Sequence, residues 1–326
     1  MSTVVVDKIT DSTIGLYDQF MRTFDFLGIS SPFNQARSVF IKPNLTYPRF
    51  KEGVTTRKVF VERLVSALRS INQTTKIYIG EGEGGYHSFS MSEAMRDMGF
   101  YEIAHAYPNV EIVNLSFMPV RQVELNAKGQ PYPLNLPEIF FEEIDFSITC
   151  PVPKVHCMTG ISLSYKNQWG CLPDLMRLKN HYVFNEIISQ VCDVLKFRYS
   201  FLDGKYGLDN NGPMKGDPVE LNWFAASNSL GALDCVVADM MGFNWRKIGH
   251  IKKAYKRGFV PDKNDINIIG NPNSFKRKFR LKRSFWNYPA LAAFHSKQLT
   301  HFVYISRWAK FIHDIMYLVR KRAVSD

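Results

Sequence analysis

The segment KVHCMTGISLSYKNQWGCLPD, residues 154–174, holds two lysines, a histidine, two cysteines and an acid within 21 residues. Such side chains could bind a metal ion, pair a thiol nucleophile with a base, or bind an anion and transfer protons. Zinc sites favour closely paired ligands, whereas Cys157 and Cys171 lie 14 residues apart. His156 and Cys157 are neighbours in an extended segment and point to opposite faces, which argues against a base and nucleophile pair.

Proton transfer and anion binding fit this segment better. His156 follows a predicted strand, titrates near neutral pH and shares one side of the pleat with Lys154. Lys166 and Asn167 follow in a polar stretch, and a second lysine beside Lys154 would create an anion pocket. We therefore assign His156 to acid–base chemistry and Lys154, Lys166 and Asn167 to substrate binding. The alternative is a loop whose hydroxyls and amides cap one another.

Two further candidates follow an earlier strand, in ARSVFIKPNL at residues 36–45. The strand is expected to end at Ile41, because Pro43 cannot donate a ladder hydrogen bond. Lys42 and Asn44 would then lie at the end of the strand, where a lysine could neutralise a carboxylate or a phosphate. The alternative is a solvated lysine in a turn that Pro43 dictates.

The glycine-rich stretch GEGEGGY, residues 80–86, follows another predicted strand. Glycines allow a close approach of the backbone to a ligand, but the stretch matches neither a Walker A loop nor a dinucleotide-binding fingerprint. Two carboxylates would also repel a phosphate. We assign Glu81 and Glu83 to substrate contact or general-base work, with a purely structural turn as the alternative.

Two aspartates complete the candidate site. Asp203 ends a predicted strand in FLDG, where it could orient a base or hold a cation. Asp239 lies on a predicted helix before Gly242 and could contact substrate, cap a helix or pair with a lysine. No metal site is assigned.

The elements that must position these residues alternate between strand and helix. Apolar spacing predicts one strand within 36–45 that ends at Ile41 and another within 75–86 that runs into the glycine-rich stretch. Further strands are predicted over 110–115, 144–156 and 198–204, and helices over 55–71, 88–99, 180–197 and 227–242. Expected helix caps are Thr55 or Thr56, and Asn180. Residues 128–137 hold three prolines and predict an inserted loop or hairpin. This order indicates an α/β fold with a mostly parallel open sheet, helices on both faces and ligands beyond the carboxyl ends of the strands.

Composition sets the class of protein. The 326 residues are 45% hydrophobic and 14% aromatic, which is typical of a globular chain, and we expect one core domain over 1–272. The first residues lack the features of a secretory signal, so a cytoplasmic location is expected. Five scattered cysteines indicate reduced thiols rather than a disulfide framework.

The net charge of +11 is concentrated near the C-terminus. Residues 246–326 hold 19 of the 41 lysines and arginines but only four acids. A basic, aromatic helical segment is therefore expected over 273–326, with an amphipathic helix over 300–320. Trp286, Phe302, Trp308 and Phe311 are among its aromatic residues.

This basic segment has two possible partners. Its helix could pack on the core or lie on an anionic membrane at the inner face of the bilayer. Charged residues interrupt it too often for a membrane span. Nucleic acid is not expected as a partner, because no known binding motif accompanies the charge.

Five separated motifs also resemble, in order, the prokaryotic family called domain of unknown function 362. They are VFIKPNL, YIGEGEGG, PVPKVHCMTGISLSYKNQWGCLPD, FLDGKYGLDNNGPMKGDP and CVVADMMG, which span roughly residues 35–245. The resemblance implies an α/β domain and a shared site at the candidate residues within these motifs. Many members carry an attached ferredoxin-like module, but this sequence lacks its cysteine runs, so an iron–sulfur cluster is not expected. His156 and Lys166 are also similar to the histidines and lysine that lactate racemases use.

These observations favour an enzyme that binds a small anionic substrate or cofactor at the sheet edge and uses His/Glu acid–base chemistry. The alternatives are a peripheral membrane protein acting on a lipid-linked or glycan-precursor substrate, and a non-catalytic binding protein. The cofactor, the reaction and the oligomeric state stay open.

Overall fold

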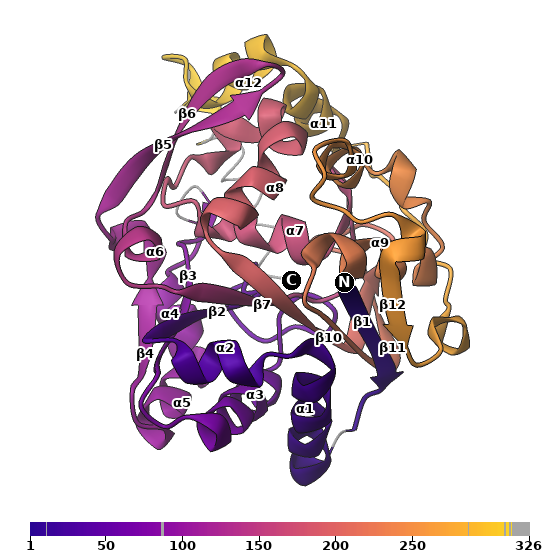
Figure 1. The fold of residues 1–326 in the computed structure, drawn as a ribbon. Coiled ribbons are helices and arrows are strands. Elements are labelled where there is room, and N and C mark those ends of the chain that lie inside the picture. Colours follow the sequence, from indigo (N-terminus) through magenta and orange to yellow (C-terminus); the bar gives the residue numbers. More distant parts are fainter. Residues whose placement is uncertain (11, 86–87, 286, 310, 313, 315–326) are drawn as a thin grey trace.

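A computed structural model describes residues 1–10, 12–85, 88–285, 287–309, 311–312 and 314 of the chain (Figure 1). Its described residues form a ten-stranded sheet with the central order β12-β1-β11-β10-β7-β2-β3-β4. The bounds of these strands are β1 Ser2–Lys8, β2 Ser38–Pro43, β3 Lys76–Glu81, β4 Val110–Asn114, β7 Phe146–Cys150, β10 Phe197–Asp209, β11 Asp217–Ser227 and β12 Ile266–Ile269. Two short strands, β8 (Lys154–His156) and β9 (Gly160–Ser162), extend the sheet beside β10.

The sheet is mostly parallel. Strands β10, β7, β2, β3 and β4 run parallel to their neighbours in that row, and β1 is parallel to β12. Strand β11 is antiparallel to both β1 and β10. The predicted α/β class with a mostly parallel open sheet is therefore confirmed.

Helices cover both faces of the sheet (Figure 1). One face carries α1 Thr13–Leu27, α2 Ser30–Gln35, α3 Lys58–Ile71, α4 Met91–Asp97 and α5 Phe100–Ala106. The other carries α6 Ile139–Glu142, α7 Ser164–Asn167, α8 Phe184–Val194, α9 Leu230–Met240 and α10 Gly249–Lys256, together with the 3₁₀-helices η3 Gln168–Cys171 and η4 Arg177–Val183. Two separate apolar cores result, one on each side of the sheet.

Strand β2 determines the direction in which the candidate residue Lys42 points. All six of its residues are buried, as expected for a central parallel strand. Val39 and Ile41 pack into the core beneath α1 and α3, whereas Phe40 packs into the opposite core. Because side chains alternate along a strand, Lys42 points to the same side as Phe40, toward α7.

The predicted elements recur with shifted bounds. Strand β2 continues to Pro43 rather than ending at Ile41. The predicted strand over 144–156 is split into β7 and β8, because prolines at 151 and 153 interrupt the ladder. The proline-containing stretch forms the second strand of a hairpin, β5 (Val120–Ala127) with β6 (Gln130–Pro137).

The expected helix caps are wrong. Arg57 precedes α3, while Thr56 Oγ1 accepts from Asn44 N at 2.8 Å and donates to the Cys150 carbonyl at 2.6 Å. Thr55 likewise bonds within its own loop. Asn180 lies inside η4, and its Oδ1 accepts from the Tyr132 hydroxyl at 2.6 Å, so α8 begins later, at Phe184. These three side chains therefore form hydrogen bonds elsewhere in the protein instead of capping a helix.

The first part of the basic C-terminal segment is hydrogen-bonded through its backbone to the rest of the protein. Backbone hydrogen bonds join Arg277 to Met240 and Phe279 to Met241, and Asn210 bonds to both Arg280 and Lys282. We call residues 277–282 the strap. The strap ties the following helices, α11 (Asn287–His295) and α12 (Lys297–Tyr304), to the body of the protein.

The helix predicted over 300–320 is interrupted. Helix α12 ends at Tyr304, and helix resumes only at Ala309. Helices α11 and α12 contact η4, so this part of the segment packs on the core. Trp286, residues 310 and 313, and residues 315–320 lie outside the described residues. None of the described helices has the length and hydropathy that a membrane span requires.

Candidate functional site

A buried ion pair forms the base of the candidate site. Lys42 is the second-last residue of β2, and Glu81 is the last residue of β3. The two side chains therefore meet at the carboxyl edge of neighbouring parallel strands. Lys42 Nζ lies 2.5 Å from Glu81 Oε2, and neither residue is more than 6% exposed. Lys42 also donates to the Pro43 carbonyl at 3.1 Å and to Asn167 Oδ1 at 3.5 Å. All three of its donors are therefore used within the protein.

Asn167 joins this pair to helix α7. Its Nδ2 donates to the Lys42 carbonyl at 3.3 Å and to Thr149 Oγ1 on β7 at 2.8 Å. Thr149 in turn donates to Gln168 Oε1 at 3.0 Å. The polar residues of the 154–174 segment thus hold α7 against the ends of β2 and β7.

Two glycines permit this close packing. A Cβ on Gly170 would lie 2.0 Å from Glu81 Oε1 and 3.1 Å from Lys42 Nζ. A Cβ on Gly82 would lie 2.5 Å from the Gly170 carbonyl, which accepts a hydrogen bond from Gly82 N at 3.1 Å. The glycine-rich stretch therefore serves as a close contact with the 154–174 segment.

Lys154 is buried beside this pair without a carboxylate partner among the described residues. Its Nζ donates to Asn44 Oδ1 at 3.1 Å, Thr46 Oγ1 at 3.4 Å and the Val54 carbonyl at 2.7 Å. Burial, with repulsion from Lys166, holds the pKa of Lys154 well below its usual value. Asn44 and Lys154 therefore belong to the framework, and Lys154, like Lys42, uses all three of its donors within the protein.

Lys166 differs from the other two lysines. Its side chain is partly exposed, and its Nζ forms no hydrogen bond or ion pair with the described residues. It lies 5.4 Å from the ring centroid of Phe184. Burial, followed by repulsion from Arg177 and Lys42, lowers the pKa of Lys166 to about 8. This amine can exchange a proton near neutral pH.

His156 lies in the same electrostatic environment. Its Nδ1 accepts from Met158 N at 3.1 Å, which places the proton of the neutral ring on Nε2. Burial, and then repulsion from Lys166 and Lys154, keeps the pKa of His156 well below 6.5. At neutral pH this side chain is a hydrogen-bond donor through Nε2, and no described residue accepts that bond.

Three buried aromatic side chains around Phe184 were missed from the sequence. Trp169, His181 and His250 have ring centroids 4.9, 6.5 and 5.6 Å from that of Phe184. Trp169 Nε1, His181 Nδ1 and both nitrogens of His250 are buried without a partner among the described residues. Unpartnered buried nitrogens are costly, and a ligand that offers both hydrogen-bond acceptors and donors would satisfy them.

Both missed histidines are electrostatically coupled to Lys166. Burial, followed by its charge, lowers the pKa of His181 and of His250 to about 3. They are isolated in the sequence and lie on different elements, η4 and α10, so spacing could not reveal them. Among the described residues, no three His, Cys, Asp or Glu side chains form a group that could hold a metal ion.

Asp234 positions helix α7 and was also missed. This fully buried residue of α9 accepts hydrogen bonds from Ser164 N at 2.8 Å and Tyr165 N at 3.1 Å, the first amides of α7. Burial raises its pKa to about 7 despite these bonds. The available signal was that Asp234 lies among the apolar residues in the first half of the helix LGALDCVVADM.

Three predicted site residues lie elsewhere or are already occupied. Glu83 Oε1 accepts from Met91 N at 3.1 Å and from Asn114 Nδ2 at 2.6 Å, which anchors α4. Asp203 forms a buried ion pair with Arg57 at 2.8 Å. Asp239 is exposed on α9 and lies outside the site.

The remaining groups form what we call the Lys166 cluster: Lys166, His156, Trp169, His181 and His250. It rests on a framework in which four cationic side chains, Lys42, Lys154, Lys166 and Arg177, are accompanied by two carboxylates, Glu81 and Glu83. The excess of positive charge favours an anionic ligand. With both glutamates occupied, Lys166 and His156 are the groups left to move or share a proton.

Replacing Gly170 with alanine should break the framework. The added methyl would overlap the Glu81 carboxylate and leave Lys42 without its partner, so we expect unfolding to become easier by roughly 3 kcal/mol. Gly85→Ala is the matched control, because none of the described residues beyond its chain neighbours lies within 4 Å of the methyl that it would add and its φ is ordinary. Denaturant unfolding of both variants measures the difference, and equal stabilities would contradict this role of Gly170.

Stability should fall in acid because of the two buried histidines. Their folded pKa of about 3 lies below the usual 6.5, so the unfolded chain binds more protons between these values. The free energy of unfolding should therefore decrease as the pH falls from 6.5 toward 3. His250→Phe should flatten this slope in pH-dependent denaturant unfolding, whereas His105→Asn, at an exposed position, should not. An unchanged slope in His250→Phe would contradict the assignment.

Parts of the chain are similar to known proteins. A thylakoid-associated protein of Synechocystis sp. is 32% identical over 106 residues, which are 30% of this chain and 33% of that protein. The match thus spans about a third of the length of this curated relative. A Thermotoga maritima structure aligns with a TM-score of 0.41 and 14% identity, covering 64% of this chain and 53% of that one. The lactate racemase apoprotein of Thermoanaerobacterium thermosaccharolyticum aligns with a TM-score of 0.44 and 12% identity, covering 79% and 57%.

The family comparison covers most of the sheet and the whole 154–174 segment. The sequence profile described as Domain of unknown function (DUF362) matches residues 39–239. This range includes every predicted site residue and agrees with the order of motifs noted in the sequence. The chain therefore belongs to the DUF362 family.

Proposed function

We propose that this protein is an enzyme that binds a small anionic substrate, bearing a carboxylate or phosphate group, at the Lys166 cluster. The observation that carries the proposal is Lys166 itself: an amine with a pKa of about 8 and no partner among the described residues. Such an amine is poised for acid–base work at physiological pH. The buried, unpartnered nitrogens around it supply further contacts for a ligand.

The reaction that these groups support best is proton transfer at a carbon next to a carbonyl or carboxylate. In its neutral form Lys166 takes the proton as the C–H bond breaks, and the electron pair moves onto the substrate oxygen. The Nε2–H of His156 donates a hydrogen bond to that oxygen, where negative charge develops.

Lys166 can be tested directly by measuring its protonation and its contribution to binding. Competitive acetylation followed by mass spectrometry should give Lys166 a midpoint near pH 8. Bound lactate or inorganic phosphate should raise that midpoint, because an anion stabilises the charged amine. Lys166→Met should weaken the binding of these probes by roughly 10- to 100-fold in calorimetry, which is the usual contribution of a charge-assisted hydrogen bond.

The exposed Lys215 provides the control in both measurements. Lys215→Met should bind the probes like the unmodified protein, because this lysine has no contact with the Lys166 cluster. A Lys166 that titrates alongside Lys215, or a Lys166→Met variant with unchanged binding, would sink the proposal.

We infer as a second function that the C-terminal segment attaches the protein peripherally to an anionic membrane, at its inner face. Phe302, Trp308 and Phe311 are each at least half exposed, although they belong to a folded segment. Exposed aromatic side chains among lysines and arginines suit the interface of an anionic bilayer. The cyanobacterial relative is named for its association with thylakoids, which agrees with this idea.

Membrane binding predicts a specific effect of polar substitutions. Phe302→Ser, Trp308→Ser and Phe311→Ser combined should reduce flotation with phosphatidylglycerol vesicles at least about tenfold, because the interfacial apolar surface is lost. The matched control combines Ile14→Ser, Phe26→Ser and Phe117→Ser, which are similarly exposed outside the segment. Equal flotation of the two triple variants would exclude this attachment.

A further inference from the structure

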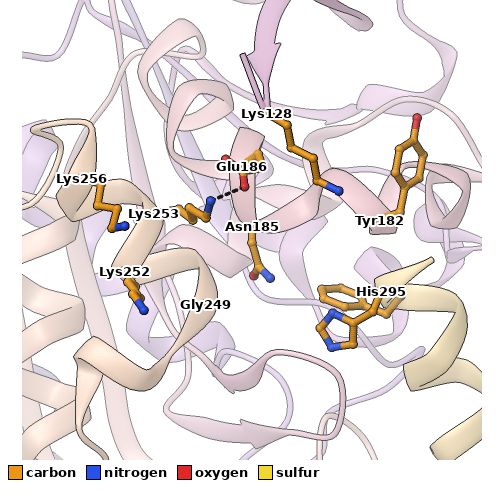
Figure 2. Close-up of a pocket in the computed structure, with 10 residues that line it drawn as sticks. Lys128, Tyr182, Asn185, Glu186, Gly249, Lys252, Lys253, Lys256 and His295 are labelled. Carbon is orange, nitrogen blue, oxygen red and sulfur yellow. Dashed lines mark ion pairs between the residues drawn. The ribbon is translucent and has the colours of Figure 1, made fainter. Parts of the chain in front are cut away.

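A second basic site lies apart from the Lys166 cluster, in a cavity of about 340 Å³. The cavity is bounded by the turn of the β5–β6 hairpin, the first turn of α8, helix α10 and the end of α11 (Figure 2). Its lining residues are Lys128, Tyr182, Asn185, Glu186, Gly249, Lys252, Lys253, Lys256, Phe294 and His295. None of the predicted site residues lines it.

The charge of this cavity is strongly positive. Four lysines line it, against the single carboxylate of Glu186. That carboxylate is already engaged, at 2.6 Å from Lys253 Nζ and 3.6 Å from Arg257 Nη2. The ammonium groups of the other three lysines have no hydrogen bond or ion pair with the described residues. Their charges therefore remain available to a ligand.

The backbone around the cavity adds to this charge. Helix α10 begins at its wall, and no side chain caps the first amides of this helix. The N-terminus of a helix carries a partial positive charge and unsatisfied N–H groups. A Cβ on Gly249 would lie 2.8 to 3.0 Å from the Asn185 side-chain amide, so glycine allows the two helix starts to approach. Figure 2 shows Asn185 between Lys252 and Lys253 on one side and Lys128 on the other.

We infer that this cavity binds a phosphate-bearing group. Several ammonium groups, the Asn185 amide and the N-terminus of α10 lie at one cavity, which suits the several oxygens and the charge of a phosphate. The group could belong to a soluble phosphorylated compound or to the headgroup of a lipid. The second source is accessible because α11, which lines the cavity, leads directly into the aromatic residues of α12 (Figure 1).

This inference does not rest on the proposed chemistry at Lys166. Phe294 lines the cavity and also contacts the rings of His181 and Phe184, at 5.3 and 5.8 Å between centroids. The aromatic ring thus lies against both sites. Lys252 and Lys256 line the cavity but do not belong to the Lys166 cluster. The phosphate site can therefore be tested through these two lysines with the cluster intact.

The test compares two double variants of the full chain. Lys252→Ala with Lys256→Ala removes two unpaired charges of the cavity, and Lys215→Ala with Lys278→Ala removes the same charge from exposed positions outside it. The soluble probes are inorganic phosphate and glycerol 3-phosphate, measured by calorimetry. The lipid probes are phosphatidylcholine vesicles with and without phosphatidylglycerol, measured by flotation.

We expect the cavity variant to bind at least about tenfold more weakly than the control variant. A loss confined to the soluble probes supports the site with a soluble ligand. A loss with the phosphatidylglycerol vesicles, reversed in unmodified protein by competing glycerol 3-phosphate, supports it with a lipid headgroup. Equal binding by the two double variants, or no binding of any phosphate probe by the unmodified protein, overturns the inference.

Discussion

The buried ion pair between Lys42 and Glu81 is the interaction on which the candidate site depends. Removing two charges from water costs several kcal/mol per ion, and only close geometry with additional hydrogen bonds offsets that cost. Both conditions are met here, because Asn167, the Pro43 carbonyl and the amides of Leu45 and Gly82 complete the pair. Two strand ends and the 154–174 segment are consequently held in one arrangement.

This arrangement divides the lysines into two kinds. Lys42 and Lys154 have saturated hydrogen bonds and act on the rest of the site through their charge alone. Burial lowers the pKa of Lys166 most, and the charges of Arg177 and Lys42 lower it further. This amine has no hydrogen-bond or ion-pair partner in the described part of the chain. Lys42 and Lys154 thus hold the framework together, whereas the amine of Lys166 stays available to a ligand.

Local patterns predicted the parallel half of the sheet, and strand ends correctly brought Lys42, Glu81, Lys154 and Asn167 together. Which charges are already neutralised could not be predicted, since Glu83 and Asp203 are bound by residues far away in the sequence. The same holds for His181 and His250, whose common feature is their position around Phe184 rather than any spacing.

The position of β1 has a consequence for how the protein folds. This strand, at the extreme N-terminus, lies between β11 and β12, which end at Ser227 and Ile269. During synthesis the backbone edges of β1 are both paired only after the chain has been made as far as Ile269, the end of β12. Until then the exposed strand could pair with other nascent chains. Early chaperone binding to residues 2–8 would therefore protect the folding of the whole sheet.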